Sequence, residues 1–130
     1  MSGLRYPIPN FMDTLNQPQR EAVLTVDRPL LVVAGAGSGK TRVITMKIAH
    51  LIREHGYLAR HIAAITFTNK AAREMRERAS GLLRPEEAKG LNVSTFHTLG
   101  LNIIRRELKT LGYKSSFSIF DSQDAGTLLK

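Results

Sequence analysis

Residues 30–41 read Leu30-Leu31-Val32-Val33-Ala34-Gly35-Ala36-Gly37-Ser38-Gly39-Lys40-Thr41. The apolar run over 30–34 is short and continuous, which predicts a strand buried on both faces, as in a parallel sheet. The small residues after it predict a tight turn whose backbone N–H groups point inward at an anion. A helix is expected next, from about Thr41 to His55, with Gly56 as its stop. Strand, glycine-rich turn and helix in this order form the pattern of a phosphate-binding loop, with Ala34 in place of the usual first glycine.

The positions of this loop have different expected roles. The residues expected to surround the phosphates are Ala34, Gly35, Ala36, Gly37, Ser38 and Gly39. Lys40 is expected to reach the β- and γ-phosphates, and the Thr41 hydroxyl to ligate Mg²⁺. The partial positive charge at the start of the helix favours the same anionic ligand. Such a loop indicates a nucleotide but leaves the reaction open.

Helices and strands are expected to alternate on both sides of the loop. Asn16 is a good N-cap and Pro18 is tolerated in a first turn, so a short helix is expected up to about Thr25. Further strands are expected over 62–67, 91–95 and 117–120, and further helices over 70–79 and 98–111, with a polar loop around Pro85. This alternation predicts an α/β fold with a parallel sheet, whose strand-to-helix turns meet at the carboxyl edge of the strands.

Each of the three longer helices has an apolar stripe at helical spacing. The stripes consist of Ile44, Ile48, Leu51 and Ile52, then Ala71, Ala72, Met75 and Ala79, then Leu101, Ile104, Leu108 and Leu111. These faces are expected to pack against the sheet or against one another.

Composition narrows the class of protein. The chain has 130 residues, 42% of them hydrophobic, which suits one globular domain or part of one. Nineteen Lys and Arg against 11 Asp and Glu give a net charge of +8, which favours a polyanionic partner. The absence of cysteine excludes a disulfide scaffold and any thiolate metal site. No apolar run approaches the ~20 residues of a membrane span and residues 1–14 look like a flexible leader, so a cytoplasmic location is expected.

Four segments together resemble a known family. They are Leu15-Asn16 with Gln19, Ala34 through Arg42, Ile65-Thr66-Phe67-Thr68-Asn69-Lys70-Ala71-Ala72, and Ser94-Thr95-Phe96-His97-Thr98. In order and spacing they resemble the Q motif and motifs I, Ia and Ib of superfamily 1 DNA helicases, in particular the Rep branch of the Rep/UvrD/PcrA group. The resemblance covers residues 15–130. It implies a RecA-like P-loop NTPase fold, ATP and Mg²⁺ as cofactors, and a part in DNA replication and repair.

The resemblance also gives Gln19 and Arg42 a role in binding ATP. Gln19 would read the adenine edge, for which a planar amide with adjacent donor and acceptor is suited. Arg42 would lie near the base or ribose. From spacing alone, Gln19 fits better as the partner of Asn16 in a capping box, and Arg42 fits an exposed helix residue.

The same resemblance implies contacts with single-stranded DNA. The implied contact residues are Thr66, Phe67, Thr68, Asn69, Lys70, Thr95, Phe96 and His97. Phe67 would stack on a base, and Lys70 would contact a phosphate. Taken without the family, Phe67 is as well explained as a core aromatic, and a lone histidine such as His97 is more often structural.

What the chain lacks limits its expected activity. A Walker B strand ends in Asp-Glu, and no Asp of this chain is followed by Glu; the stretch 117–124 has a strand pattern and Asp121 but not the Glu. The resemblance therefore implies that residues 15–120 are the N-terminal part of a motor domain and that 121–130 begin an inserted helical subdomain. The parent would be a 3′–5′ helicase and translocase acting on single strands and duplex junctions, while the 130 residues alone are expected to be inactive. The alternatives are a nucleotide- and nucleic-acid-binding module without catalysis and, less well matched, a small P-loop kinase.

Overall fold

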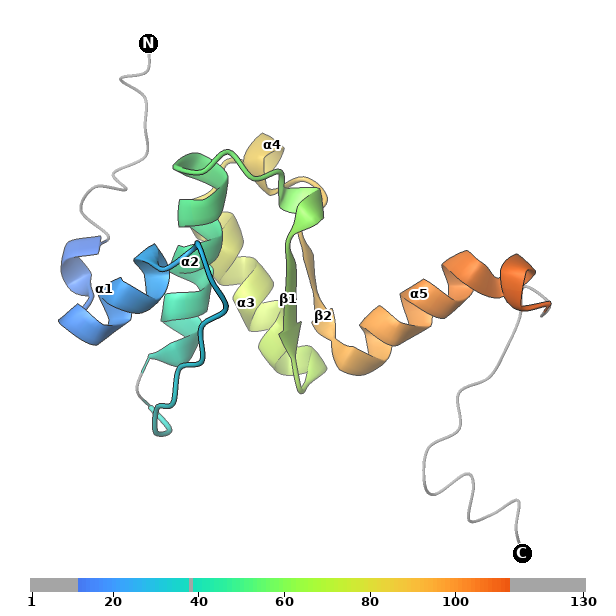
Figure 1. Ribbon diagram of the computed structural model, residues 1–130, viewed down its shortest axis with the longest axis horizontal. Helices are drawn as coiled ribbons and strands as arrows, with labels where there is room; N and C mark the ends of the chain where they lie inside the picture. Colours follow the sequence, from blue (N-terminus) through green and yellow to red (C-terminus); the bar gives the residue numbers. More distant parts are fainter. Residues whose placement is uncertain (1–11, 38, 113–130) are drawn as a thin grey trace, which may run out of the picture. The chain divides into compact units, whose positions relative to one another are not determined.

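The computed structural model describes residues 12–37 and 39–112, in two units that meet between Phe96 and His97 (Figure 1). Its helices are α1 (Gln17–Leu24), α2 (Lys40–Arg53), α3 (Asn69–Leu82), α4 (Pro85–Ala88) and α5 (Phe96–Leu111). The strands are β1 (Ala63–Thr66) and β2 (Asn92–Thr95), and short 3₁₀ turns form at Met12–Thr14 and Ala59–His61. None of the described helices has the length and apolar character needed to cross a membrane.

The two strands form a small parallel sheet, as expected for a βαβ unit. Ala63 pairs with Asn92 and Thr66 with Thr95, so the two carboxyl ends are level. The connection between the strands contains α3, whose first turn is capped by Thr68: the Thr68 hydroxyl accepts the Ala71 N–H at 3.0 Å. The α/β character predicted from the sequence is therefore confirmed for the described residues.

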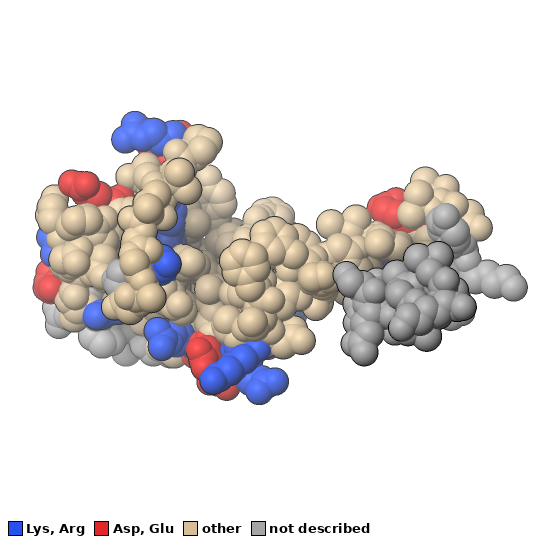
Figure 2. Space-filling view, turned by 90° about the horizontal axis from the view of Figure 1, so that it is seen from below, with Lys and Arg blue, Asp and Glu red and all other residues tan. Residues whose placement is uncertain are grey.

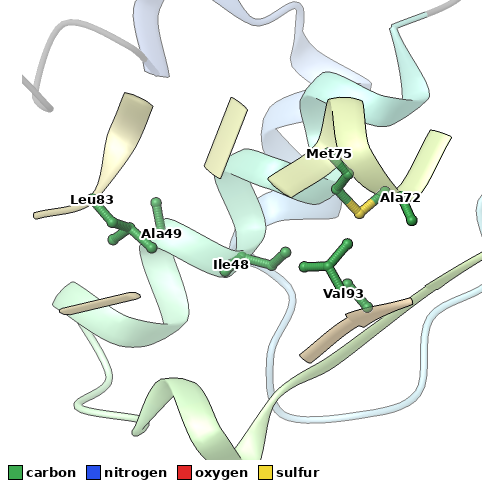
Figure 3. Close-up of a cluster of buried hydrophobic side chains, with 7 residues drawn as sticks. Ile48, Ala49, Ala72, Met75, Leu83 and Val93 are labelled. Atoms are coloured by element: carbon green, nitrogen blue, oxygen red, sulfur yellow. The ribbon is translucent and has the colours of Figure 1, made fainter. Parts of the chain in front are cut away.

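A buried apolar cluster joins this sheet to α2 and α3 (Figure 3). Its members are Ile48 and Ala49 from α2, Ala64 from β1, Ala72 and Met75 from α3, Leu83, and Val93 from β2. The predicted stripe of α3 is confirmed for Ala72, Met75 and Ala79, which are all buried, while Ala71 is half-buried. Small alanines at these positions let the helices approach the short strands closely.

A second cluster joins α1 to the opposite side of α2. It consists of Leu15, Ala22 and Val23 packed on Val43 and Met46, and Val23 is completely buried. α2 is therefore buried along two faces, one against α1 and one against α3 and the sheet. This double burial explains why the predicted stripe of α2 is only partly right: Ile48 is buried, but Ile44 is 42% exposed, and Val43 and Met46 take its expected place.

The strand predicted over residues 30–34 is not formed. These residues are extended and unpaired in the described part of the chain, and Leu30, Leu31, Val32 and Val33 are 44%, 86%, 47% and 89% exposed. A strand in the middle of a sheet needs hydrogen-bonding neighbours and a cover on each face. The sheet of the described residues has only β1 and β2, which pair with each other. The prediction was wrong because an apolar sequence shows only that a segment could be buried as a strand. No described element pairs with this segment or covers it.

Smaller differences concern element limits. A short helix, α4, forms where a loop around Pro85 was expected, and α3 extends to Leu82. On α5 the predicted stripe is mixed, with Leu108 buried but Ile104 and Leu111 43% and 55% exposed. The strand expected over 117–120 lies outside the described residues, as does the rejected stretch 117–124.

An ion pair fastens the far end of α2 to α4. Arg53 donates to the Glu87 carboxylate at 2.9 Å, with both side chains largely buried. Glu87 also accepts the Arg84 backbone N–H at 2.8 Å and a bond from the Arg84 side chain. Partial burial alone would raise the pKa of Glu87, but these hydrogen bonds outweigh it and hold the pKa below its usual value. The carboxylate is therefore more stable in the folded chain than in the unfolded one.

Replacing Glu87 with Gln should lower the free energy of unfolding by about 1–3 kcal/mol at pH 7, because Arg53 loses its partner in a partly buried site. Since the folded pKa lies below the unfolded one, this contribution is present above pH 4.5 and disappears as the pH falls through the folded pKa. Urea unfolding between pH 3 and 7 measures both effects. Glu86→Gln is the matched control, because Glu86 is 67% exposed and should cost under ~0.5 kcal/mol.

Candidate nucleotide and DNA site

The glycine-rich loop before α2 adopts a left-handed backbone at two described positions. Gly37 and Gly39 have φ values of 75° and 83°, in the left-handed region that favours glycine. Gly39 is the N-cap of α2 and no side chain caps this end. The first N–H groups of α2 are therefore available as donors to an anion, which fits a nucleotide phosphate. Ser38 lies outside the described residues.

Lys40 and Thr41 form the first turn of α2 directly after the loop. The Lys40 ammonium is exposed and donates to the Ala34 carbonyl at 3.0 Å, so it bridges the two ends of the loop. Thr41 is half-buried. No group of three acidic or histidine side chains suited to a metal ion occurs among the described residues. Among the described residues of the predicted loop, the Thr41 hydroxyl is the candidate Mg²⁺ ligand, and it suits an ion held mainly by phosphate oxygens and water.

Gln19 is brought to the loop by the packing of α1 on α2. The Gln19 Oε1 accepts the Asn16 N–H and the Asn16 Oδ1 accepts the Gln19 N–H, both at 3.0 Å, so the capping box favoured by the spacing is present. At the same time the Gln19 Nε2 lies only 3.0 Å from the place that a Cβ on Gly39 would occupy. One side chain therefore caps α1 and faces the phosphate loop, and the two interpretations of Gln19 are compatible.

Arg42 faces the 3₁₀ turn that precedes α1. Its guanidinium donates to the Thr14 hydroxyl, while the side chain stays exposed. Arg42 is therefore tied to the segment that leads into the helix carrying Gln19.

The carboxyl ends of β1 and β2 carry an exposed aromatic pair. Thr66 and Thr95 are paired across the sheet, so Phe67 and Phe96 follow at the same level. Their ring centroids are 6.2 Å apart with the planes tilted by 52°. Phe67 is 91% exposed and Phe96 61%. Within the described part of the chain, Phe67 is therefore not a core aromatic.

The turn after β1 holds Phe67 outward. The Thr66 hydroxyl donates to the Thr68 carbonyl at 3.0 Å, and Thr68 caps α3. Asn69 and Lys70 are exposed in the first turn of α3. These hydrogen bonds give Phe67 a fixed backbone while its ring is left in solvent.

The predicted residues around β2 differ from one another in exposure. Thr95, at the end of β2, is only 6% exposed, so its side chain does not lie on the surface. His97 is exposed and begins the second unit. An unpredicted residue, Arg76, donates to the Val93 carbonyl at 2.7 Å and so ties α3 to β2.

The phosphate loop and the ends of both strands lie toward one side of the first unit, the lower side in Figure 1. Figure 2 views the molecule from that side and shows several Lys and Arg patches, with some Asp and Glu among them, beside a largely uncharged surface. The exposed cations of the site are Lys40, Arg42 and Lys70. A nucleotide loop, an aromatic pair and positive charge on one side are together suited to a nucleotide and a nucleic-acid strand.

Comparison with known proteins agrees with this geometry. Residues 15–130 match the family described as the UvrD/REP helicase N-terminal domain. Over 116 residues the chain is 66% identical to the ATP-dependent DNA helicases Rep of Salmonella typhimurium and of Escherichia coli. It is 51% identical over 116 residues to the ATP-dependent DNA helicase PcrA of Leuconostoc citreum.

These alignments cover 89% of this chain but only 17% of each Rep protein and 16% of the PcrA protein. The α/β arrangement, the phosphate loop and the exposed aromatic pair thus occur in a segment that those helicases share. The chain belongs to the UvrD/REP helicase family, in the part that forms the N-terminal domain.

Proposed function

We propose that this chain is the ATP- and single-stranded-DNA-binding portion of an ATP-dependent 3′–5′ DNA helicase and translocase. The observation that carries the proposal is the exposed Phe67–Phe96 pair on the same side of the unit as the phosphate loop. The proteins that this chain resembles are named ATP-dependent DNA helicases, which supports the proposal. A cytoplasmic location follows from a function on chromosomal DNA in bacteria such as those relatives.

ATP with Mg²⁺ is the proposed ligand of the loop, and its hydrolysis would supply the free energy for movement along DNA. Residues 34–39 and the first N–H groups of α2 would surround the phosphates, with Lys40 turning from the Ala34 carbonyl to a phosphate oxygen. Thr41 would hold Mg²⁺. Gln19 would read adenine, and Arg42 would lie beside the base or ribose.

Single-stranded DNA, including the strand next to a duplex junction, is the proposed partner of the strand ends. Phe67 and Phe96 would stack on bases, an interaction that tolerates any sequence. Thr66, Thr68, Asn69 and Lys70 would bind the DNA backbone with hydroxyl, amide and ammonium groups. His97 would extend this contact. Because Thr95 is buried, its contribution would come from holding Phe96 at the sheet edge.

A RecA-like fold is the proposed context of this unit. Exposure along residues 30–33 alternates, with Leu31 and Val33 far more exposed than Leu30 and Val32. A period of two is that of a strand, in which successive side chains point to opposite sides. In the complete motor domain the segment would be a central strand, with 15–120 forming the first part of that domain and 121–130 leading into an inserted helical subdomain.

A binding module without catalysis is the second candidate for these 130 residues taken alone. It is favoured by one observation, the absence of any Asp-Glu pair in the sequence to hold Mg²⁺ and orient the attacking water. The two candidates agree on the ligands, and both expect ATP turnover at background level for the isolated chain. They differ in whether a longer protein that carries this segment hydrolyses ATP.

Lys40→Ala should weaken the binding of Mg-ATP to the chain at least tenfold, because the loop loses its phosphate-directed cation. Isothermal calorimetry or an NMR titration measures the affinity. Lys109→Ala removes the same charge from α5 and should leave binding unchanged. Equal ATP affinity in the parent chain and in Lys40→Ala would contradict the proposed phosphate site.

Phe67→Ala should weaken binding to single-stranded DNA by ~1–3 kcal/mol with little change in its salt dependence, since stacking involves no charge. Lys70→Ala should instead reduce the salt slope. Fluorescence anisotropy with a labelled oligonucleotide at several salt concentrations separates the two effects. Tyr57→Ala, at a 49% exposed aromatic before β1, is the control. Unchanged affinity in Phe67→Ala, with its melting temperature retained, would refute the stacking role.

In hydrogen exchange, the amides of Leu31, Val32 and Val33 should exchange rapidly in the 130-residue chain, because no described element pairs with them. In a helicase of the length of the relatives that carries this segment, the same amides should be strongly protected. Fast exchange in both proteins would rule out a central strand at this position.

A further inference from the structure

The carbonyl end of α1 is capped by a lysine from another helix. The Lys47 ammonium, on α2, donates to the Ala22 carbonyl at 2.9 Å and to the Thr25 carbonyl at 2.5 Å. α1 has no basic residue in its own last turn. Lys47 therefore satisfies carbonyl groups that the helix leaves open and places a positive charge at the negative end of its dipole.

The Lys47 side chain is held in a partly buried position. Burial lowers its pKa below the usual lysine value, yet the group keeps two oxygen acceptors at short distance. The hydrogen bonds of this ammonium group are directional, because each carbonyl oxygen must lie along an N–H bond. The apolar contact of Val23 with Val43 and Met46 is not directional and would tolerate rotation of α1.

This tether joins the two helices that carry the nucleotide-directed segments. Lys47 follows Lys40 by two turns of α2, and Ala22 follows Gln19 by about one turn of α1. The opposite end of α1 approaches the loop, where the Gln19 Nε2 would be 3.0 Å from a Cβ on Gly39. A rotation or shift of α1 on α2 would thus move the Gln19 amide relative to the phosphate loop.

The orientation of that amide decides which base it can accept. Its Oε1 already accepts the Asn16 N–H and has a second lone pair for an amino group. Adenine offers an amino donor at the position where guanine has a carbonyl acceptor. An Oε1 fixed in place therefore attracts adenine and repels guanine, whereas a displaced amide discriminates poorly.

We propose that Lys47 is a positioning residue for base recognition: by joining the carbonyl end of α1 to α2, it holds the Gln19 amide against the phosphate loop and so sustains a preference for adenine over guanine nucleotides. This inference rests on the proposed role of Gln19 in reading adenine. It adds Lys47, which lies outside the four sequence motifs, to the residues that set nucleotide specificity.

The test uses the isotope-labelled 130-residue chain and the variants Lys47→Met, Lys47→Arg and Gln19→Ala. NMR titration gives the affinities for Mg-ATP and Mg-GTP, and nuclear Overhauser contacts between the Gln19 side-chain amide and Gly39 report the position of the amide. Lys47→Met should lose these contacts and lower the ATP-to-GTP affinity ratio about three- to tenfold. Affinity for inorganic triphosphate should not change. Lys47→Arg, which keeps two donors, should restore most of the ratio.

Glu87→Gln is the matched control, because it weakens the other end of α2 without touching α1. If Lys47→Met lowers stability as Glu87→Gln does but keeps the Gln19–Gly39 contacts and the ratio, the lysine is only structural and the inference fails. If Gln19→Ala leaves the ATP-to-GTP affinity ratio unchanged, Gln19 does not recognise adenine and the proposed role of Gln19 is wrong. The Gln19–Gly39 contacts in Lys47→Met then still show whether Lys47 positions the Gln19 amide. Should Lys47→Met not fold, Lys47→Leu, which also has no donor, replaces it with the same expected results.

Discussion

Burial of α2 on two faces is the constraint on which the rest of the first unit depends. Val43 and Met46 pack on α1, while Ile48 and Ala49 pack on α3 and the sheet. The helix that begins at the phosphate loop is therefore the common neighbour of both clusters. Because close-packed interiors resist displacement, this packing sets how closely the loop-bearing helix lies to α1 on one side and to the sheet on the other.

Local signals in the sequence were sufficient for much of this arrangement. The Asn16–Gln19 spacing predicted a capping box that is present, and the alanine stripe of α3 predicted its buried face. Ile44 shows a limit of this reasoning. Its spacing on α2 is that of a single buried face, but α2 has two buried faces. Which side chains of α2 are buried depends on the packing of α1 and α3, which local spacing does not predict.

The candidate site divides in the same way. The phosphate loop could be predicted because its chemistry is contained in consecutive residues, 34–41. The Phe67–Phe96 pair required the strand register, since only the level pairing of Thr66 with Thr95 brings the two rings together. Lys47 gave no sequence signal, because its acceptors are backbone carbonyls and these are the same whatever side chain α1 carries.

The extended segment over residues 30–33 has a consequence for handling the protein. Its side chains are apolar, its backbone groups are unpaired in the described chain, and nothing in the stretch is charged or proline. Sheet edges of natural proteins avoid this combination, because unpaired backbone groups beside apolar side chains can form strand-to-strand hydrogen bonds with another molecule. At high concentration the isolated chain should therefore associate with itself through this segment, and the substitution Val33→Lys should keep it monomeric by adding a charge there.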